Sequence, residues 1–135
     1  MIIYSRHITR KDCQNNKNSI FIFGDNDERK GYGGLAKELR GEPNAIGIRV
    51  KKKPTREPDA YYTDDELETN TGKITEDINK VIDWINEGKF DTIIFPHNGI
   101  GTGLADMERK CPETFKYMNL VLEGTLAIKN GSGHT

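Results

Sequence analysis

Residues 19–34 read SIFIFGDNDERKGYGG, and this stretch decides the fold class. Its first five residues form a dense run of β-branched and aromatic side chains, which is typical of a strand that is buried on both faces. From Gly24 onward the stretch is polar and rich in glycine, so we expect an irregular loop there. Apolar residues at helical spacing then predict a short helix over 35–39, which Gly41 ends. The stretch is therefore a strand, a glycine-rich loop and a helix in succession.

The same succession occurs again nearer the carboxyl end of the chain. A buried strand is expected over 92–95 (TIIF), and a second glycine-rich loop follows it over 96–106. Pro112 is well placed in the first turn of a helix that we expect to reach residue 122. Two strand–loop–helix units in one chain favour a sheet whose strands run parallel.

The remaining segments complete an alternation of strands and helices. A long helix is expected from Ile74 to a C-cap at Gly88, with the acidic residues Glu76, Asp77 and Asp83 facing water. The other expected elements are strands over 2–4 and 44–50, a polar loop over 11–18 and an edge strand over 125–128. This order predicts an α/β domain over 1–129, with a mainly parallel or mixed central sheet and helices on both faces. Residues 130–135 are expected to form a tail.

Both glycine-rich loops follow a buried strand directly, so we expect them at the same edge of the sheet, where such folds bind ligands. In the first loop, glycines allow close approach to a ligand, and the start of the following helix offers free N–H groups. Asp25 and Asn26 end the strand, where they are placed to reach a ribose hydroxyl. The candidate ligand-binding residues are Gly24, Asp25, Asn26, Gly31, Tyr32, Gly33 and Gly34. The alternative is that these glycines only form turns that Asp25 caps.

The second loop carries glycines at three alternate positions, a pattern that resembles a nest of N–H groups for phosphate. Thr102 is placed to add a hydroxyl donor, whereas His97 fits either a phosphate contact or a hydrogen-bonding structural role. The candidate ligand-binding residues are His97, Asn98, Gly99, Ile100, Gly101, Thr102, Gly103 and Leu104. The two loops together predict a pocket for a phosphate-bearing, nucleotide-like ligand.

The motifs IIFP…GIGTGL and FGDN…GYGGLAKEL resemble the second phosphate loop and the first, ligand-wrapping loop of macrodomains. The resemblance is strongest to the compact subgroup that contains the terminal ADP-ribose protein glycohydrolase, whose second loop has the form P-x-I-G-x-G-L-D. It spans roughly residues 19–122, and its identities lie almost entirely in the two loops. It implies a macrodomain-like fold that binds ADP-ribose, with the diphosphate between the loops. We expect no cofactor and no metal.

The resemblance also implies a catalytic lysine at the end of the strand after the first helix, and an acidic residue in the second loop. Lys51 matches the lysine, with Lys52 next, and Asp106 is the candidate acid. Asp106 comes one residue later than the family pattern, because Ala105 directly follows Gly-Leu. A lysine of lowered pKa can attack the anomeric carbon of a ribose, and a carboxylate can activate water to release the product.

The resemblance therefore implies an enzyme that removes ADP-ribose from an ADP-ribosylated protein or nucleic acid through Lys51 and Asp106. Two alternatives remain open from the sequence. The pocket fits a non-catalytic reader or sequestering module for ADP-ribose or a related nucleotide, with residues 51–53 as a solvated charge run. A proline followed by GIGTG also resembles the phosphate loop of nucleotide phosphoribohydrolases of the lysine-decarboxylase-like group, for which Glu108 is only loosely placed.

Composition excludes several other classes of protein. The 135 residues hold 20 basic and 21 acidic side chains and a net charge of −1, without the basic surplus of a general nucleic-acid binder. Cys13 and Cys111 lie outside any CxxC or Cys/His pattern, so we expect free thiols in a reducing compartment. No apolar run approaches a membrane span, and the amino terminus is not a secretory signal. We therefore expect a monomeric cytoplasmic protein of bacterial or phage style with no membrane partner.

Overall fold

The computed structural model describes residues 1–131 and has a four-stranded sheet at its centre. The strands are β1 (Ile2–Ser5), β2 (Ser19–Asn26), β3 (Ala45–Lys51) and β4 (Thr92–Pro96). Their order across the sheet is β1-β4-β2-β3, and every pair of neighbours runs parallel. The expected α/β class with a mainly parallel sheet is therefore confirmed.

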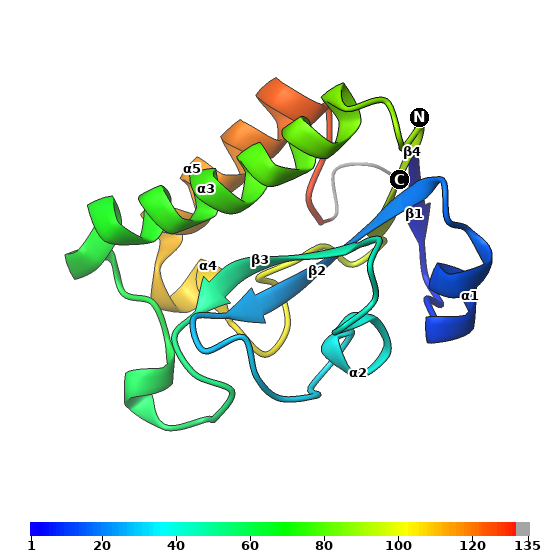
Figure 1. Ribbon diagram of the computed structural model, residues 1–135. Coiled ribbons are helices and arrows are strands. Elements are labelled where there is room, and N and C mark those ends of the chain that lie inside the picture. The colour runs from blue at the N-terminus through cyan, green and yellow to red at the C-terminus, as the bar shows by residue number, and fades with distance from the viewer. Residues whose placement is uncertain (132–135) are drawn as a thin grey trace.

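Helices cover both faces of this sheet (Figure 1). The long helices α3 (Leu67–Asn86) and α5 (Pro112–Leu126) lie over one face, and the short helices α1 (Arg10–Asn15) and α2 (Ala36–Leu39) lie over the other. Shorter elements are α4 (Met107–Lys110) and the 3-10 turns Pro58–Ala60 and Asp64–Glu66.

Alternation along β2 explains why both faces need a cover. Ile20 and Ile22 belong to the core on the α3 and α5 side, whereas Phe21 and Phe23 belong to the core on the α1 and α2 side. All four side chains are at most 4% exposed. A strand with apolar side chains on both faces can bury all of them only if helices cover both faces of the sheet, as the run SIFIF predicts.

Helix α3 buries the face that its apolar spacing predicts, with Ile74, Ile78 and Val81 fully buried. It ends just before Gly88, whose φ of +79° suits the residue after a helix C-cap. One expectation for this helix is wrong, because Asp77 is only 3% exposed rather than facing water. Residue 77 lies three positions after Ile74 and four before Val81, so it shares their face.

Two segments differ from the expected elements. Helix α1 takes up most of the stretch over 11–18 that was expected to be a loop. It begins at a capping box in which the side chains of Thr9 and Asp12 each accept the other's backbone N–H. No strand forms over 125–128, because α5 continues to Leu126 and the left-handed Ala127 closes its last turn on the carbonyl of Glu123. Polar composition in the first segment and β-branching in the second were misleading.

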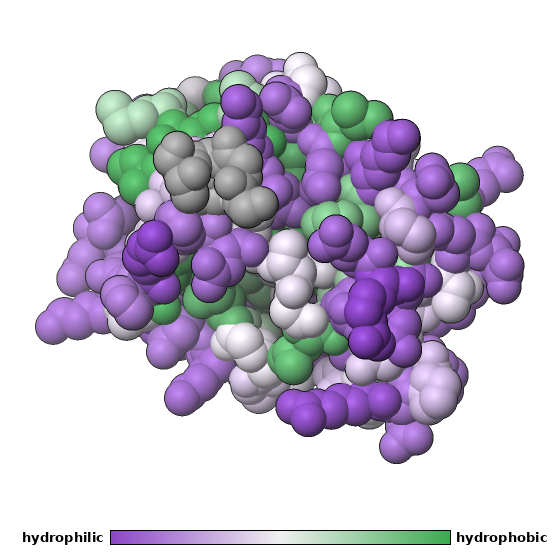
Figure 2. Space-filling model, turned by 180° about the vertical axis from the view of Figure 1, so that it is seen from behind, coloured by the Kyte–Doolittle hydropathy of each residue, from purple (hydrophilic) through white to green (hydrophobic). Residues whose placement is uncertain are grey.

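The expected tail over 130–135 is only partly described. Residues 132–135 lie outside the described residues, whereas Asn130 hydrogen-bonds the backbone of Ile100. Seen from behind, the surface is mainly hydrophilic, with smaller hydrophobic areas between the polar side chains (Figure 2). Among residues 1–131 no helix has the length and apolar character needed to cross a membrane.

We expect Asp64 to stabilise the fold by capping α5 from outside the helix. Its carboxylate accepts the backbone N–H groups of Glu113 and Thr114, at 3.0 Å each, and the Thr114 hydroxyl at 2.9 Å. Replacing a side chain that caps a helix costs about 1 kcal/mol. Asp64→Ala should therefore lower the free energy of unfolding in urea by about that amount, whereas Asp65→Ala, on the exposed neighbour, should change it little.

The same cap should depend on pH. Burial raises the pKa of Asp64, but the hydrogen bonds from Glu113 and Thr114 outweigh it and hold that pKa below its ordinary value. A depressed pKa in the folded state means that the stabilisation is complete above the unfolded value of about 3.9 and is lost as pH falls further. A stability difference between wild type and Asp64→Ala that stays constant down to pH 2 would contradict this assignment.

Candidate nucleotide-binding site

The carboxyl ends of β2, β3 and β4 open into one cavity of about 210 Å³. Both glycine-rich loops line it, as their positions after β2 and β4 predict. The first loop contributes Gly24, Asp25, Asn26, Lys30, Gly31, Tyr32, Gly33 and Gly34. The second contributes Pro96, Gly99, Ile100, Gly101, Gly103, Leu104 and Ala105. Lys51 and Pro54 line the side that follows β3, so three chain segments converge on the cavity.

The backbone of the second loop offers a run of unused donors. Within the part of the chain that the structure describes, the N–H groups of residues 101–105 donate no hydrogen bond to another protein group. The same holds for residues 31–35 of the first loop. All residues of the two runs except Thr102 line the cavity. Successive backbone N–H groups of this kind form concavities that bind anions such as phosphate.

The glycines of the second loop serve different purposes. Gly99 and Gly101 have φ values of +84° and +75°, and a Cβ at either would lie 2.4 Å from a neighbouring side-chain atom. The loop therefore needs glycine at positions 99 and 101 in order to fold, whether or not it binds a ligand. Gly103 has no positive φ, and a Cβ there would have no atom within 4 Å, so the protein itself does not require glycine at this position. Open space beside a cavity is what close approach of a ligand requires.

Two large apolar side chains are exposed where the loops meet. Tyr32 of the first loop is 68% exposed, and Leu104 of the second is 52% exposed. The loops touch at this point, since a Cβ on Gly33 would lie 3.1 Å from Cδ1 of Leu104. Both residues line the cavity, and exposed apolar side chains at a cavity commonly mark a binding surface.

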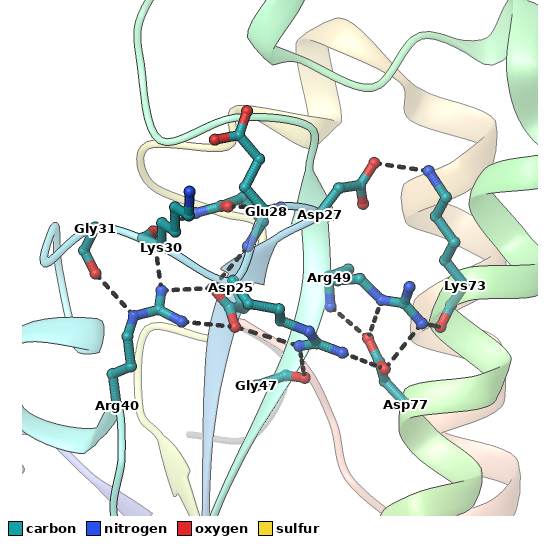
Figure 3. Close-up of polar contacts among 12 residues, drawn as sticks. Asp25, Asp27, Glu28, Lys30, Gly31, Arg40, Gly47, Arg49, Lys73 and Asp77 are labelled. Atoms are coloured by element: carbon teal, nitrogen blue, oxygen red, sulfur yellow. Dashed lines mark hydrogen bonds and ion pairs between the residues drawn. The ribbon is translucent and has the colours of Figure 1, made fainter.

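Asp25 organises the first loop rather than offering a free carboxylate. One of its oxygens accepts Arg40 Nη2 at 2.6 Å and the Asn26 N–H at 2.8 Å, and the other accepts Arg40 Nη1 and Arg29 Nη1 at 3.1 and 3.2 Å (Figure 3). All four lone-pair positions of the carboxylate are therefore occupied. Arg40 also donates to the carbonyls of Lys30 and Gly31, which shapes the loop. The expected ribose contact by Asp25 has no acceptor left in this arrangement.

Asn26, like Asp25, uses its side chain to shape the first loop. Its side-chain oxygen accepts the Glu28 N–H at 3.0 Å, and its side-chain nitrogen donates to the Lys30 carbonyl at 2.8 Å. These bonds bend the chain directly after β2. Asn26 lines the cavity, but its polar atoms are engaged within the loop.

The Asp25 cluster continues to α3 through a second buried carboxylate. Arg29 joins the two acids, since it also donates to Asp77 at 2.7 Å and to the Gly47 carbonyl at 2.6 Å. Arg49 donates to Asp77 through both its backbone N–H and its side chain, at 2.8 and 3.0 Å (Figure 3). The sequence reasoning missed Arg29, Arg40 and Arg49. The available signal was Asp77, an acid on the apolar face of a helix, which needs a buried cation.

Lys51 is the buried cation of the cavity. It ends β3 and is 8% exposed, its Nζ donates to the Thr55 carbonyl at 2.8 Å, and it lies 4.8 Å from the centre of the Tyr61 ring. Burial, and then repulsion from Arg56, lower the pKa of Lys51. A lower pKa increases the fraction of Lys51 whose amine is neutral at a given pH, and the neutral amine is the nucleophilic form. Lys52 points elsewhere and pairs with Glu66.

Four predicted site residues are absent from the described lining of the cavity: His97, Asn98, Thr102 and Asp106. The Thr102 hydroxyl donates to the Asn98 carbonyl at 2.7 Å, so it is engaged within the loop. Asp106 precedes α4 and pairs with Arg109 at 2.9 Å, while Ala105 faces the cavity in its place. Because of the one-residue offset in the sequence, Ala105 occupies the position at which the macrodomain loop pattern P-x-I-G-x-G-L-D has its aspartate.

We expect Gly47→Ala to disrupt the Asp25 cluster. A Cβ at residue 47 would lie 2.7 Å from Asp25 Oδ2 and 2.8 Å from Asp25 Cβ, and the tightly bound carboxylate cannot yield. Overpacking of this kind costs about 1–3 kcal/mol, measurable as a lower urea midpoint. Gly72→Ala on α3, with no atom within 4 Å, should instead raise stability by up to about 1 kcal/mol. Equal midpoints for the two variants would contradict the assignment.

Comparison with known proteins places the chain in a family without supplying an activity. No curated protein and no solved structure matches it. A family model matches residues 3–120, a stretch that includes both glycine-rich loops, Lys51 and Asp106. The chain belongs to DUF7831, a family of unknown function.

Proposed function

We propose that this protein binds ADP-ribose, or a closely related nucleotide with two phosphates, between its glycine-rich loops. The observation that carries the proposal is the pair of facing loops whose N–H groups, over 31–35 and 101–105, have no partner in the described chain. One loop would suit one phosphate group, and two loops on one cavity suit a diphosphate. The resemblance of both loops to those of macrodomains supports the same ligand.

The size of the cavity fits part of such a ligand. Pockets that enclose a whole drug-sized ligand measure about 300–1,000 Å³, so 210 Å³ suits the diphosphate and one sugar. The rest of the ligand would then lie against the exposed side chains of Tyr32 and Leu104. Lys51 lines the same cavity and adds a positive charge that favours a phosphate-bearing ligand. The free thiols of Cys13 and Cys111 support a cytoplasmic setting.

Gly103→Ala should weaken ADP-ribose binding without weakening the fold. The new methyl group meets no protein atom within 4 Å, but it enters the space that the bound diphosphate would occupy. We expect micromolar binding of ADP-ribose to wild type by calorimetry, much weaker binding of AMP, and a loss of about tenfold, near 1.4 kcal/mol, for the variant. Gly124→Ala, also without contacts and on α5, serves as the matched control. No heat with ADP-ribose, together with an unchanged melting temperature, would overturn the proposal.

Release of ADP-ribose from a modified protein or nucleic acid is a second candidate function, which the burial of Lys51 favours. Its neutral amine would attack the anomeric carbon, the bond to the acceptor would break, and water would then release ADP-ribose from the lysine. Asp106 would have to leave Arg109 to activate that water. Among the described residues, Asp25 is the one carboxylate that lines the cavity, and arginines engage it, so binding is better supported than turnover.

Lys51→Ala should abolish any release of ADP-ribose while binding persists within a few-fold. Lys52→Ala is the matched control, because it removes the same group from the adjacent residue, which points to Glu66. Because the neutral amine is the attacking form, the release rate should rise with pH, and the lowered pKa of Lys51 predicts that it levels off below the ordinary lysine value of about 10.4. Release that survives in both variants would exclude the lysine mechanism.

A further inference from the structure

We propose that Asn130 is a positioning residue that holds the second loop in its phosphate-binding shape. The inference rests on the proposed function, and it concerns a residue that lies outside the stretch matched by the family model. Asn130 follows α5, from whose end the chain turns toward the sheet (Figure 1). It therefore reaches the loop from a part of the sequence far from both glycine-rich motifs.

The side chain of Asn130 hydrogen-bonds both backbone polar groups of one loop residue, Ile100. Its Oδ1 accepts the Ile100 N–H at 2.8 Å, and its Nδ2 donates to the Ile100 carbonyl at 3.0 Å. Nδ2 also donates to Oδ1 of Asn119 on α5 at 2.8 Å. The amide thus uses its oxygen once and its two N–H donors once each, so only one orientation of the side chain satisfies all three bonds.

The loop is built to admit this side chain. A Cβ on Gly99 would lie 2.4 Å from Asn130 Oδ1 and 2.8 Å from the backbone nitrogen of Gly131. Gly99 is thus the residue that lets Asn130 reach the neighbouring peptide groups. Ile100 itself is 3% exposed and belongs to the core next to α5, so the gripped residue is also anchored by packing.

The hydrogen bonds of Asn130 to Ile100 also orient the N–H group of Gly101, because the Ile100 carbonyl and the Gly101 N–H share one peptide plane. The Ile100 carbonyl and the Gly101 N–H belong to the same planar trans peptide group, so they point in opposite directions. A hydrogen bond that fixes the carbonyl toward Asn130 therefore fixes the Gly101 N–H away from it. Gly101 lines the cavity and begins the run of unpartnered N–H groups over 101–105. Asn130 would in this way orient a donor without touching the ligand.

The experiment combines hydrogen exchange with ligand titration in three variants. Asn130→Ala removes all three bonds, Asn130→Asp keeps an acceptor for the Ile100 N–H but loses both donors, and Lys129→Ala changes the exposed neighbour. The readouts are the exchange rate of the Ile100 amide, the chemical shift of the Gly101 amide and the Kd for ADP-ribose. Urea midpoints identify any variant that is unfolded.

We expect Asn130→Ala to speed Ile100 exchange and to weaken ADP-ribose binding, each by about tenfold. Asn130→Asp should leave Ile100 protected yet shift the Gly101 amide and weaken binding, which a merely structural role would not produce. Lys129→Ala should resemble wild type. Faster exchange with an unchanged Kd, or unchanged exchange in Asn130→Ala, would overturn the proposal. If the wild type binds no ADP-ribose, the proposed function is overturned instead. The exchange rate of the Ile100 amide and the chemical shift of the Gly101 amide would then still test whether Asn130 orients the loop.

Discussion

The parallel pairing of β2 with β4 is the constraint from which the site follows. The two strands are far apart in the chain, yet they lie side by side, with Ile20 opposite Ile93 and Phe21 opposite Ile94. Because both run in the same direction, the loops that follow them leave the sheet at one edge. Had β4 joined the sheet at an outer edge beyond β1, the two loops would have been separated by a strand. Their convergence on one cavity thus depends on strand order.

Charge pairing stiffens one side of that cavity. Asp25 and Asp77 are both nearly fully buried, and three arginines satisfy them. A buried carboxylate without such partners would be costly, so the acids and arginines are present as a set. The set links the first loop to β3 and α3, and it leaves the loop's N–H groups available. A preorganised loop loses less conformational freedom when a ligand binds.

The opposite side of the cavity is shaped without charge. Glycines at 99 and 101 let the second loop pack against Asn130 and Met107, so its backbone rather than its side chains forms much of this side of the cavity. Lys51 is then the buried cation at the cavity without a carboxylate partner in the described chain, and its hydrogen bond to a backbone carbonyl leaves its charge uncompensated.

The sequence by itself determined the α/β class, both loops and their common edge, because dense apolar runs and glycine clusters are local signals. The resemblance to macrodomains directed attention to Lys51, and the run NAIGIRV located that residue at the end of a strand. Tertiary structure decided which acids are free. Asp25 is saturated by arginines at positions 29 and 40, and Asp106 pairs with Arg109. Arg29 and Arg109 lie four and three residues from their acids, but sequence spacing does not show whether such a pair forms within a loop, and Arg40 is fifteen residues from Asp25. Asn130 could be found only in three dimensions, because its partners lie 30 and 11 residues away and no local pattern marks them.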